Sequence, residues 1–406
     1  MDKKNKNPNV PNLRFPEFDG EWEKYNVSDI LNTFPTNSLS WDNLSYKCGK
    51  IKNIHYGLIH NGFDTTCVYT TNKIIPFIKD GNFPLEYTLL KTGDLILADA
   101  SENRKDVGRP IEIINDICEN IISGLHTIHA RDESNIAVQG FKGFYFQSKS
   151  MKSQIYRIAN GSKIYGISPS NFKELHMCLP DHLEQEKIVV LLRKIETRIQ
   201  TQSKIIKDLE SVKNEISNRI FKLKLIEKST KYLAEYLREG DKTPVNTFKY
   251  KKITIKLNKQ GIVYSDINRD MADTRPFYIR HKDELIIGKQ NYFNGSIAIV
   301  DEQYDNCICS NAIMSFNVVG INKEFLYFQL SNNNYLNSQS YKANGTGQKE
   351  LSEKELLNFK IWCPSIEEQI KIVNCFKALD GKIKNEKAVL NSYMQEKDYL
   401  LTNMFI

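Results

Sequence analysis

Basic and amide side chains gather in two separate stretches of this chain, where they flank short runs of β-branched residues. Arginine, lysine, asparagine and glutamine are the side chains that hydrogen-bond phosphate oxygens and base edges. The first set is Arg104, Lys105, Arg109, Arg131, Lys142, Lys149 and Lys152. The second set is Arg269, Arg275, Arg280, Lys282, Lys289, Gln290, Lys342, Gln348 and Lys349. Any one of them could be an ordinary surface charge, so the prediction of a DNA-binding surface depends on both sets together.

No motif in the sequence predicts catalysis. There is no G-x-x-x-x-G-K-S/T loop for nucleotide phosphates, no glycine-rich dinucleotide fingerprint and no Asn-Pro-Pro-aromatic motif. Asp181, Glu184 and Lys187 are too closely spaced for a nuclease site and are better explained as the start of a helix. A Ser/His/Asp triad has no fixed spacing, and nothing indicates one. We therefore predict a binding protein that is not an enzyme.

The histidines and cysteines do not predict a metal site. The seven histidines do not cluster with acidic residues at metal-ligand spacing. His126 and His129 lie in a predicted strand and turn, where we expect a structural or DNA-facing role. The eight cysteines include no C-x-x-C pair, and the two nearest are Cys307 and Cys309. We expect no metal, no cofactor and reduced thiols.

Composition indicates a soluble, cytoplasmic protein. The chain is 40% hydrophobic and 26% charged, as is usual for globular domains. Its net charge of +7, from 56 Lys+Arg and 49 Asp+Glu, favours a nucleic-acid partner only slightly. The polar N-terminal residues 1–20 predict an extended arm and not a signal peptide. The longest apolar run, Ile188–Leu192, is far shorter than the roughly 20 residues that span a membrane.

A long segment of the chain occurs twice. Residues Pro180–Lys222 align without a gap to Pro364–Ile406 at a shift of 184. The identical pairs include Pro180/Pro364, Glu184/Glu368, Gln185/Gln369, Lys187/Lys371, Ile188/Ile372, Val189/Val373, Ile199/Ile383, Lys213/Lys397 and Phe221/Phe405. So long a period is not that of a solenoid, whose repeats run about 20–50 residues. It predicts two large half-molecules, each ending in a long helix.

Both copies carry apolar residues in alternating steps of three and four, which is typical of a coiled coil. The first seam is Ile188, Leu192, Ile195, Ile199, Gln202, Ile206, Leu209, Lys213, Ile216, Ile220 and Leu223. The second is Ile372, Phe376, Leu379, Ile383, Glu386, Leu390, Tyr393, Lys397, Leu400 and Met404. Polar residues interrupt both seams at the same two places. The alternative is that each stripe is simply the core-facing side of an amphipathic helix.

The polar interruptions suggest how the two helices align. If the helices pair antiparallel, Lys213 can lie opposite Glu386 and Gln202 opposite Lys397. This register would match apolar layers elsewhere, for example Ile199 with Leu400. Buried polar pairs are known to fix alignment in coiled coils.

The regions before each helix predict mixed domains with short strands. Glycine, asparagine and aspartate separate the β-branched runs. The predicted strands lie within Lys91–Ala98, Ile111–Ile114, Phe141–Gln147, Lys252–Leu257, Asp283–Ile287 and Ser296–Val300. The halves also share similar segments, which are Gly93–Leu97 with Asp283–Ile287, Phe144–Gln147 with Leu326–Gln329, and Lys24–Leu31 with Lys231–Arg238.

We therefore predict an α+β fold of two mixed α/β domains in a pseudo-twofold arrangement, separated by two long antiparallel coiled-coil helices. The predicted parts are an arm (1–20), a first domain (21–179), a central helix (180–228), a second domain (229–363) and a C-terminal helix (364–406).

Several motifs resemble the specificity subunit of Type I restriction–modification systems. Leu13–Pro16 with Trp22 is similar to the family's entry motif, and a strand and proline lead into Glu-Gln-x-Lys-Ile-Val in both Leu175–Val189 and Phe359–Val373. Gly345–Gln348 also fits the family's Gly-Ser/Thr-x-Gln pattern. Gly161–Ile164 lacks the glutamine, so a contact inferred for Gln348 does not carry over to the first half.

The resemblance implies a function in DNA recognition. Each mixed domain would be a target recognition domain that reads one half of a split sequence in double-stranded DNA. The helix pair would be a spacer that also docks two modification (methyltransferase) subunits, and restriction (translocase/endonuclease) subunits would join them. S-adenosylmethionine, ATP and Mg would then be bound by the partner subunits only, and this chain would be non-catalytic.

Two other classes of function remain open from the sequence. A coiled-coil assembly scaffold that reads no DNA would explain the helices but not the two basic, loop-rich domains. A self-contained nuclease or methyltransferase would require activity from the chain alone, and we expect none. A spacer is plausible in scale, because Ile188–Leu223 would span about 50 Å as a helix and one DNA turn is about 34–36 Å.

Overall fold

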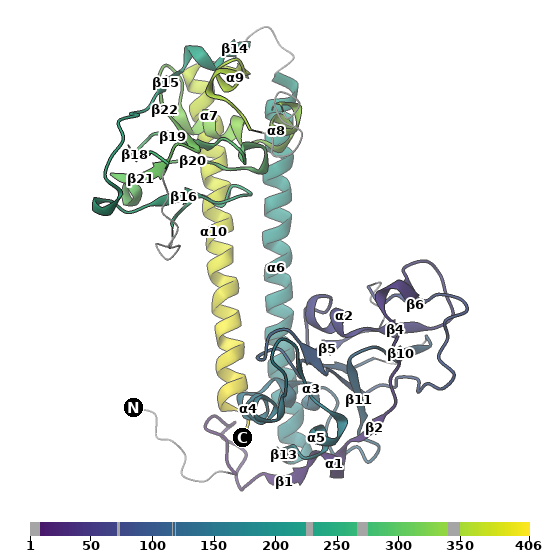
Figure 1. Ribbon diagram of the computed structural model, residues 1–406. Coiled ribbons are helices and arrows are strands. Elements are labelled where there is room, and N and C mark those ends of the chain that lie inside the picture. Colours follow the sequence, from purple (N-terminus) through teal and green to yellow (C-terminus); the bar gives the residue numbers. More distant parts are fainter. Residues whose placement is uncertain are drawn as a thin grey trace. The chain divides into compact units, whose positions relative to one another are not determined.

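The computed structural model describes residues 9–70, 74–115, 117, 119–224, 230–265, 275–339 and 350–406. The chain divides into two compact units. Unit 1 is Met1–Lys204 with Ala388–Ile406, and unit 2 is Ile205–Lys387. Two long helices, α6 (His182–Lys224) and α10 (Ile366–Asn403), each contribute to both units (Figure 1).

Unit 1 is built on two sheets. Its strands are β1 (Glu23–Asn26), β2 (Asn32–Phe34), β3 (Leu44–Ser45), β4 (Lys52–Ile54), β5 (Cys67–Val68), β6 (Phe77–Ile78), β7 (Leu95–Ala98), β8 (Ala100–Ser101), β9 (Pro110–Ile113), β10 (Ile121–Ser123), β11 (Thr127–Arg131), β12 (Tyr165–Gly166) and β13 (His176–Leu179). Its shorter helices are α1 (Val27–Ile30), α2 (Tyr56–Asn61), α3 (Phe141–Gln147), α4 (Lys149–Ile158) and α5 (Pro169–Lys173). The main sheet has the order β2-β11-β7-β9-β5, and a second has the order β10-β4-β6-β3.

Unit 2 repeats the centre of this plan. Its strands are β14 (Thr230–Tyr232), β15 (Leu237–Glu239), β16 (Ile253–Ile255), β17 (Ile262–Tyr264), β18 (Phe277–Arg280), β19 (Leu285–Gly288), β20 (Ile297–Ile299), β21 (Cys307–Ser310), β22 (Ile313–Val318) and β23 (Lys360–Trp362). Its shorter helices are α7 (Lys323–Leu330), α8 (Asn333–Gln339) and α9 (Glu353–Leu357). The order β15-β22-β19-β20 corresponds to β2-β11-β7-β9 of unit 1.

The central strands of the two sheets are equivalent in register. Leu95 of β7 pairs with Ala130 of β11, and Leu285 of β19 pairs with Phe316 of β22, both antiparallel. Leu95 and Leu285 are fully buried. The predicted similarity of Gly93–Leu97 to Asp283–Ile287 therefore falls on the same strand of each unit.

Another comparison between the halves needs correction. Asn26 pairs with His176 in unit 1, and Tyr232 pairs with Lys360 in unit 2. Lys360 is the residue that the repeat shift of 184 relates to His176. The entry segments Lys24–Leu31 and Lys231–Arg238 are thus equivalent with a displacement of one residue from the predicted alignment. The matching lysine and tyrosine pairs misled the comparison, because sheet pairing sets the register here and not residue identity.

The segment Phe141–Gln147 is a helix, not the predicted strand. Residues Phe141–Phe146 are all buried, so no polar alternation was present to distinguish the two structures. Its N-terminus is held by the buried Glu112, which accepts hydrogen bonds from Gly140 N and Gly143 N at 2.7 Å each. A carboxylate at this position is favoured by the helix dipole.

Each long helix ends in the core of the unit where it finishes. Phe221, near the end of α6, is fully buried in unit 2 and lies 5.8 Å from the ring of Phe325. Phe405, just after α10, is buried in unit 1 and lies 5.6 Å from the ring of Phe141. The repeat shift of 184 relates Phe221 to Phe405 and Phe141 to Phe325. Both cores are therefore completed by equivalent residues.

The two helices start with the same hydrogen bonds. Gln185 is buried, accepts from Val138 N at 2.8 Å and donates to Pro180 O at 2.9 Å. Gln369 accepts from Asn322 N and donates to Pro364 O at the same two distances. The duplicated Glu-Gln motif thus has a structural role, since it joins each helix start to the loop before α3 or α7.

The helices run antiparallel within each unit, but the predicted partners of the seam lysines are wrong. Lys213 pairs with Asp380 at 2.5 Å, and Lys397 pairs with Glu196 at 2.7 Å. Each carboxylate lies six positions from the predicted partner, Glu386 or Gln202. Lysine side chains reach carboxylates that flank the seam, whereas the prediction considered seam positions alone.

The apolar part of the seam is buried at some positions and half-buried at others, such as Ile199, Leu209 and Leu390. Ile188, Leu192 and Ile195 of α6 are at most 2% exposed. Gln202 is also buried, while Glu386 forms an ion pair with Lys382 of its own helix.

Candidate nucleic-acid interface

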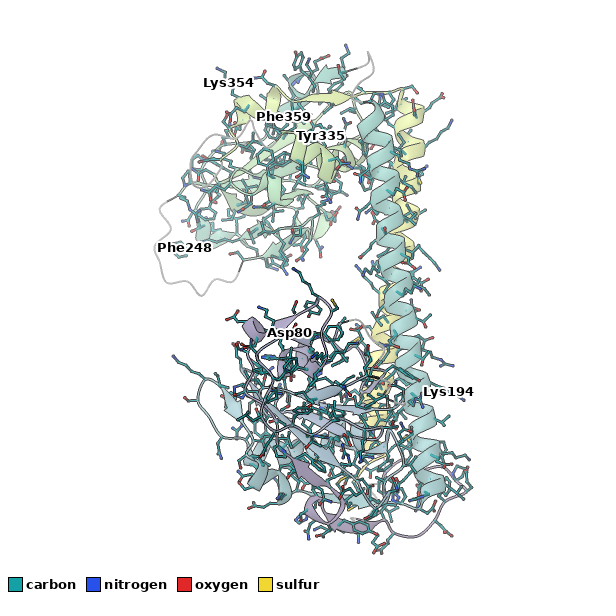
Figure 2. The ribbon with its side chains drawn as sticks, turned by 90° about the vertical axis from the view of Figure 1, so that its right-hand side faces the viewer. Asp80, Lys194, Phe248, Tyr335, Lys354 and Phe359 are labelled. Carbon is teal, nitrogen blue, oxygen red and sulfur yellow. The ribbon has the colours of Figure 1, made fainter. Side chains whose placement is uncertain are left out.

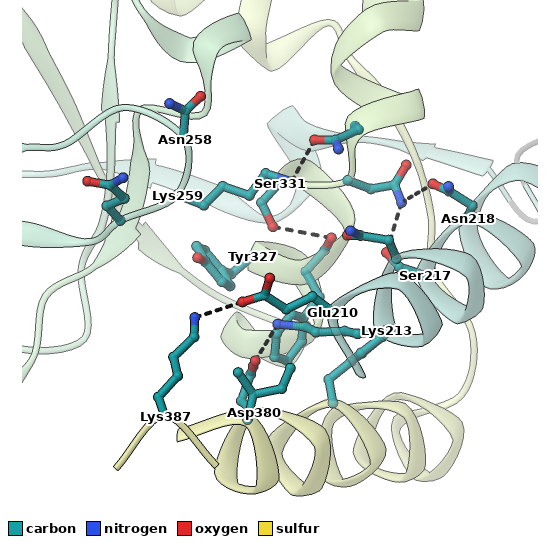
Figure 3. A pocket seen from close by; sticks show the side chains of 17 residues that line it. Glu210, Lys213, Ser217, Asn218, Asn258, Lys259, Tyr327, Ser331, Asp380 and Lys387 are labelled. Atoms are coloured by element: carbon teal, nitrogen blue, oxygen red, sulfur yellow. Dashed lines mark hydrogen bonds and ion pairs between the residues drawn. The ribbon is translucent and has the colours of Figure 1, made fainter. Parts of the chain in front are cut away.

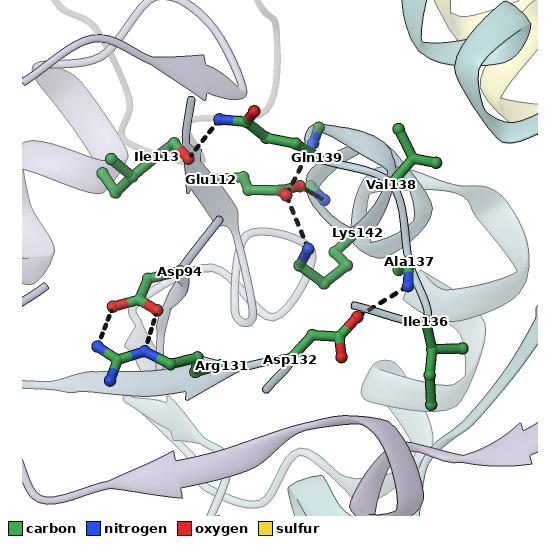
Figure 4. A network of polar contacts seen from close by, with 12 residues as sticks. Asp94, Glu112, Ile113, Arg131, Asp132, Ile136, Ala137, Val138, Gln139 and Lys142 are labelled. Atoms are coloured by element: carbon green, nitrogen blue, oxygen red, sulfur yellow. Dashed lines mark hydrogen bonds and ion pairs between the residues drawn. The ribbon is translucent and has the colours of Figure 1, made fainter. Parts of the chain in front are cut away.

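Arg131, predicted to contact DNA, is instead buried in unit 1. Its Nε donates to Asp94 Oδ1 at 2.6 Å and its Nη2 donates to Asp94 Oδ2 at 2.7 Å (Figure 4). His129 Nε2 lies 2.7 Å from the same carboxylate and is fully buried. Burial opposes ionisation of Asp94, but the bonds from Arg131 and His129 outweigh it and hold the pKa of Asp94 below its ordinary value. Arg131 and His129 therefore stabilise the sheet.

Lys142 is also buried and unavailable to DNA. Its Nζ lies 3.0 Å from Glu112 Oε1, and both side chains are at most 3% exposed (Figure 4). Because Glu112 also accepts from Gly140 N and Gly143 N, the pair joins β9 to the start of α3. Buried carboxylates are normally satisfied in this way.

Arg280 is the buried cation of unit 2. It is 2% exposed, and its Nη1 donates to Asp241 O at 3.0 Å. Its Nε donates to Cys309 Sγ at 3.0 Å. The three predictions of DNA contact for Arg131, Lys142 and Arg280 are thus corrected for one reason. Each of these cations is held by residues distant in the chain: Arg131 and Lys142 pair with buried carboxylates, and Arg280 donates to a carbonyl oxygen and a thiol.

The remaining predicted residues of unit 1 lie at the surface or partly so. Arg104 donates to Tyr156 O at 2.9 Å and stacks over the Tyr156 ring at 4.1 Å. Arg109 donates to His60 O at 2.6 Å. Lys105, Lys149 and Lys152 are exposed. The structure therefore brings the 102–109 loop beside α4, and its basic residues include both anchored and free side chains.

Unit 2 places two of its predicted residues around one small pocket. Lys289 and Arg280 line a pocket of about 170 Å³ together with Lys242, Tyr278 and Asn311. Gln290 and Arg275 are exposed, and Lys282 forms an ion pair with Glu302. Arg269, Lys342, Gln348 and Lys349 lie outside the described residues. The side chains around this pocket include hydrogen-bond donors, and base edges and phosphates can accept hydrogen bonds from such groups.

A larger pocket of unit 2, about 640 Å³, is closed by contacts among its own side chains (Figure 3). Glu210 of α6 pairs with Lys387 of α10 at 2.7 Å, beside the Lys213–Asp380 pair. Lys259 donates to Asn333 at 2.6 Å, and its burial, with Lys213 nearby, lowers the pKa of Lys259. These mutual contacts indicate a structural role, which is to hold the helices to the domain.

Metal and membrane sites are not found in the described residues. No group of three or more His, Cys, Asp or Glu side chains there is placed to hold a metal ion. The seven cysteines within the described ranges are free thiols. No helix of those ranges has the length and apolar character needed to cross a membrane.

Comparison with known proteins finds one family model that matches most of unit 2. Residues 215–392 match the model of the Type I restriction modification DNA specificity domain. This span contains every strand of unit 2 and most of α10. Unit 2 is therefore similar to this domain. The resemblance predicted from the duplicated Glu-Gln motif is confirmed.

Solved structures extend the similarity of the specificity domain to nearly the whole chain. The S subunit of a Type I restriction–modification system from M. genitalium has 16% identity, with 98% of this chain and 99% of that chain covered, at a TM-score of 0.57. A chain from a study of complex assembly and conformational transition of the type I R-M system has 14% identity, with 94% and 96% covered, also at 0.57. No curated protein sequence matches. The predicted fold class, two mixed domains with two long antiparallel helices, is confirmed.

Unit 2 also presents a basic and aromatic segment that was not predicted from the sequence. Phe248 is 97% exposed and points away from the domain, whereas Tyr335 and Phe359 lie inside it (Figure 2). Lys249 and Lys251 beside it are exposed. The signal in the sequence is the alternation of aromatic and basic residues, Phe-Lys-Tyr-Lys-Lys, at 248–252. It lies before the second set of predicted DNA-binding residues, which begins at Arg269.

Proposed function

We propose that this chain is the specificity subunit of a Type I restriction–modification complex and reads a bipartite site in double-stranded DNA. Residues 21–179 and 229–363 would be the two target recognition domains, and each would read one half of the site. The paired helices, residues 180–228 and 364–406, would set the unread gap between the halves. The chain would itself be non-catalytic.

One observation carries this proposal. The DNA specificity domain of unit 2 has a counterpart in unit 1, with the same order of four antiparallel strands and the same glutamine bonds at the helix start. One chain with two such domains is suited to a target with two separate parts. A scaffold that reads no DNA would not require two copies of a DNA specificity architecture.

The partners follow from the same proposal. Two modification subunits would dock on the helices, restriction subunits would join them, and the complex would act in the cytoplasm. S-adenosylmethionine, ATP and Mg would be held by those partners. The surface residues proposed to contact DNA are Arg104, Lys105, Arg109, Lys149, Lys152, Arg275, Lys282, Lys289 and Gln290. Arg269, Lys342, Gln348 and Lys349 remain in the proposal from the sequence alone.

The decisive experiment is to express the chain with its modification subunit and map methylated adenines across a genome. We expect a split motif with a gap of constant length. Replacing residues 230–345 with those of a relative should change only one half of the motif. Absence of any motif would contradict DNA reading, and an unchanged motif in the chimaera would contradict the assignment of domains.

A further inference from the structure

Phe248 exposes an aromatic ring that contributes nothing to the core. It is 97% exposed, whereas the other large apolar side chains of the described residues, apart from Leu85, are 70% exposed or less. A phenylalanine in water forgoes the free energy of burial that it would gain in a core. Single exposed apolar side chains are common in folded proteins, so what sets Phe248 apart is the anchored backbone and the lysines around it.

The backbone that presents Phe248 is held in place. Asn246 Oδ1 accepts a hydrogen bond from Phe248 N at 3.0 Å and caps the short 3₁₀ helix Thr247–Lys249. Val245 N donates to Phe277 O at 3.0 Å, and Ile308 N donates to Lys251 O at 2.9 Å. Both ends of the segment are thus fixed to strands of unit 2, so the backbone at Phe248 is anchored.

The charged residues near Phe248 in the sequence are all basic, and Lys242 among them is paired with Glu239 and Glu353. Residues 242–264 contain six lysines and neither aspartate nor glutamate. Lys251 Nζ lies 5.3 Å from the ring of Tyr264, and Lys252 Nζ lies 4.7 Å from the ring of Phe277. Such contacts orient the lysine stems along the surface. The lysines of this segment are suited to a polyanion, whereas protein–protein interfaces are depleted of lysine.

We propose that residues 246–252, the Phe248 segment, form a DNA contact in which Phe248 inserts against a base step while Lys249 and Lys251 bind the flanking phosphates. The inference rests on the proposed function, because it places the contact in the half-site read by unit 2. Apolar side chains that enter the minor groove partly unstack a base step, and the adjacent protein–phosphate contacts offset that cost. The rigid cap by Asn246 reduces the entropy lost on insertion.

The test uses the full chain, purified with its modification subunit, and a duplex that carries its mapped site. Phe248→Ala should weaken binding about tenfold, which is the usual scale for loss of one aromatic–base contact. Phe248→Leu should keep most of the affinity. A 2-aminopurine placed at the contacted step should brighten on binding of the wild type and not of Phe248→Ala.

The lysines require a separate readout. Lys249→Ala and Lys251→Ala should each lower the slope of log affinity against log salt by about one, while Phe248→Ala leaves the slope unchanged. Leu85→Ala is a matched control in unit 1, because Leu85 is 102% exposed. It should leave the 2-aminopurine signal in the half-site of unit 2 unchanged.

The outcomes separate this inference from the proposed function. If the wild type does not bind the duplex, both fail. If the wild type binds and Phe248→Ala binds equally well at an unchanged thermal midpoint, this inference alone fails. It also fails if Phe248→Ala keeps full DNA affinity and loses its modification subunit, since the segment would then be a protein-docking face.

Discussion

Lys397 of α10 forms an ion pair with Glu196 of α6, with 2.7 Å between Nζ and Oε1. Glu196 Oε1 also accepts from Thr66 N at 3.0 Å and from Thr66 Oγ1 at 2.8 Å. The repeat shift of 184 relates Lys397 to Lys213 and Glu196 to Asp380. Lys213 and Asp380 form the equivalent ion pair in unit 2. The duplication has therefore preserved a contact between the two helices and not only their periodicity.

The two equivalent pairs should differ in strength because they differ in exposure. The side chains of Lys397 and Glu196 are 18% and 5% exposed, and those of Lys213 and Asp380 are 28% and 46% exposed. We expect Lys397→Ala to cost about 2–3 kcal/mol in the free energy of unfolding, since Glu196 would stay buried without a counter-ion. Lys213→Ala should cost less than about 1 kcal/mol. Equal losses in urea denaturation would contradict this.

The buried glutamines at the helix starts should act on one unit each. Gln185→Leu removes the acceptor of Val138 N and the donor to Pro180 O, and should cost about 1–3 kcal/mol. Hydrogen exchange should quicken at the amide of Val138. Gln369→Leu, its matched variant, should quicken exchange at Asn322 instead. Faster exchange at both amides in either variant would argue against separate roles.

The aromatic residues at the helix ends should stabilise the unit in which the helix finishes. Phe405→Ala should leave a cavity beside Trp22 and Phe141 and destabilise unit 1 by about 3–5 kcal/mol. Phe221→Ala should do the same in unit 2. Hydrogen exchange of β7 and β19 reports the two units separately. The reverse pattern would show that the assigned cores are wrong.

His55 should make unit 1 sensitive to acid. Its Nδ1 accepts from Gly57 N at 3.1 Å, and burial, with His126 nearby, lowers the pKa of His55 from 6.5 to about 4. Between these values the unfolded chain takes up a proton and the folded chain does not. Stability should therefore fall by up to about 3 kcal/mol as pH decreases from about 6.5 to about 4.

The pH dependence can be assigned with two variants. His55→Asn keeps a helix-capping side chain and does not titrate, so denaturation midpoints should lose most of this dependence. His126→Asn removes an exposed histidine of the same cluster and should retain it. If the decline persists in His55→Asn, another group is responsible.

Buried and exposed cations of unit 1 should have separable effects. Arg131→Ala removes the counter-ion of the buried Asp94 and should cost about 3–5 kcal/mol in stability. Lys149→Ala should change stability by less than about 0.5 kcal/mol. Under the proposed function it should lower the salt dependence of DNA binding. A stable Arg131→Ala variant with a reduced salt slope would reinstate Arg131 as a DNA contact.

Local pattern was sufficient for the long helices and for five of the six predicted strands. The seam around Leu192 and Ile195 recurs at helical spacing, and β-branched runs such as Leu95–Ala98 are bounded by turn residues. Such signals arise from neighbours in the chain. Where that signal was ambiguous, as in Phe141–Phe146, which is buried throughout, the predicted element was wrong.

The sequence by itself determined the repeat, the two long helices, the α+β class and the resemblance to specificity subunits. Only the tertiary structure decided which cations are free to bind DNA, because burial depends on partners far away in the chain. Arg131 meets Asp94 across 37 residues, and Lys397 meets Glu196 across 201. Side-chain reach and core packing, and not seam periodicity, then set which residues of α6 and α10 meet.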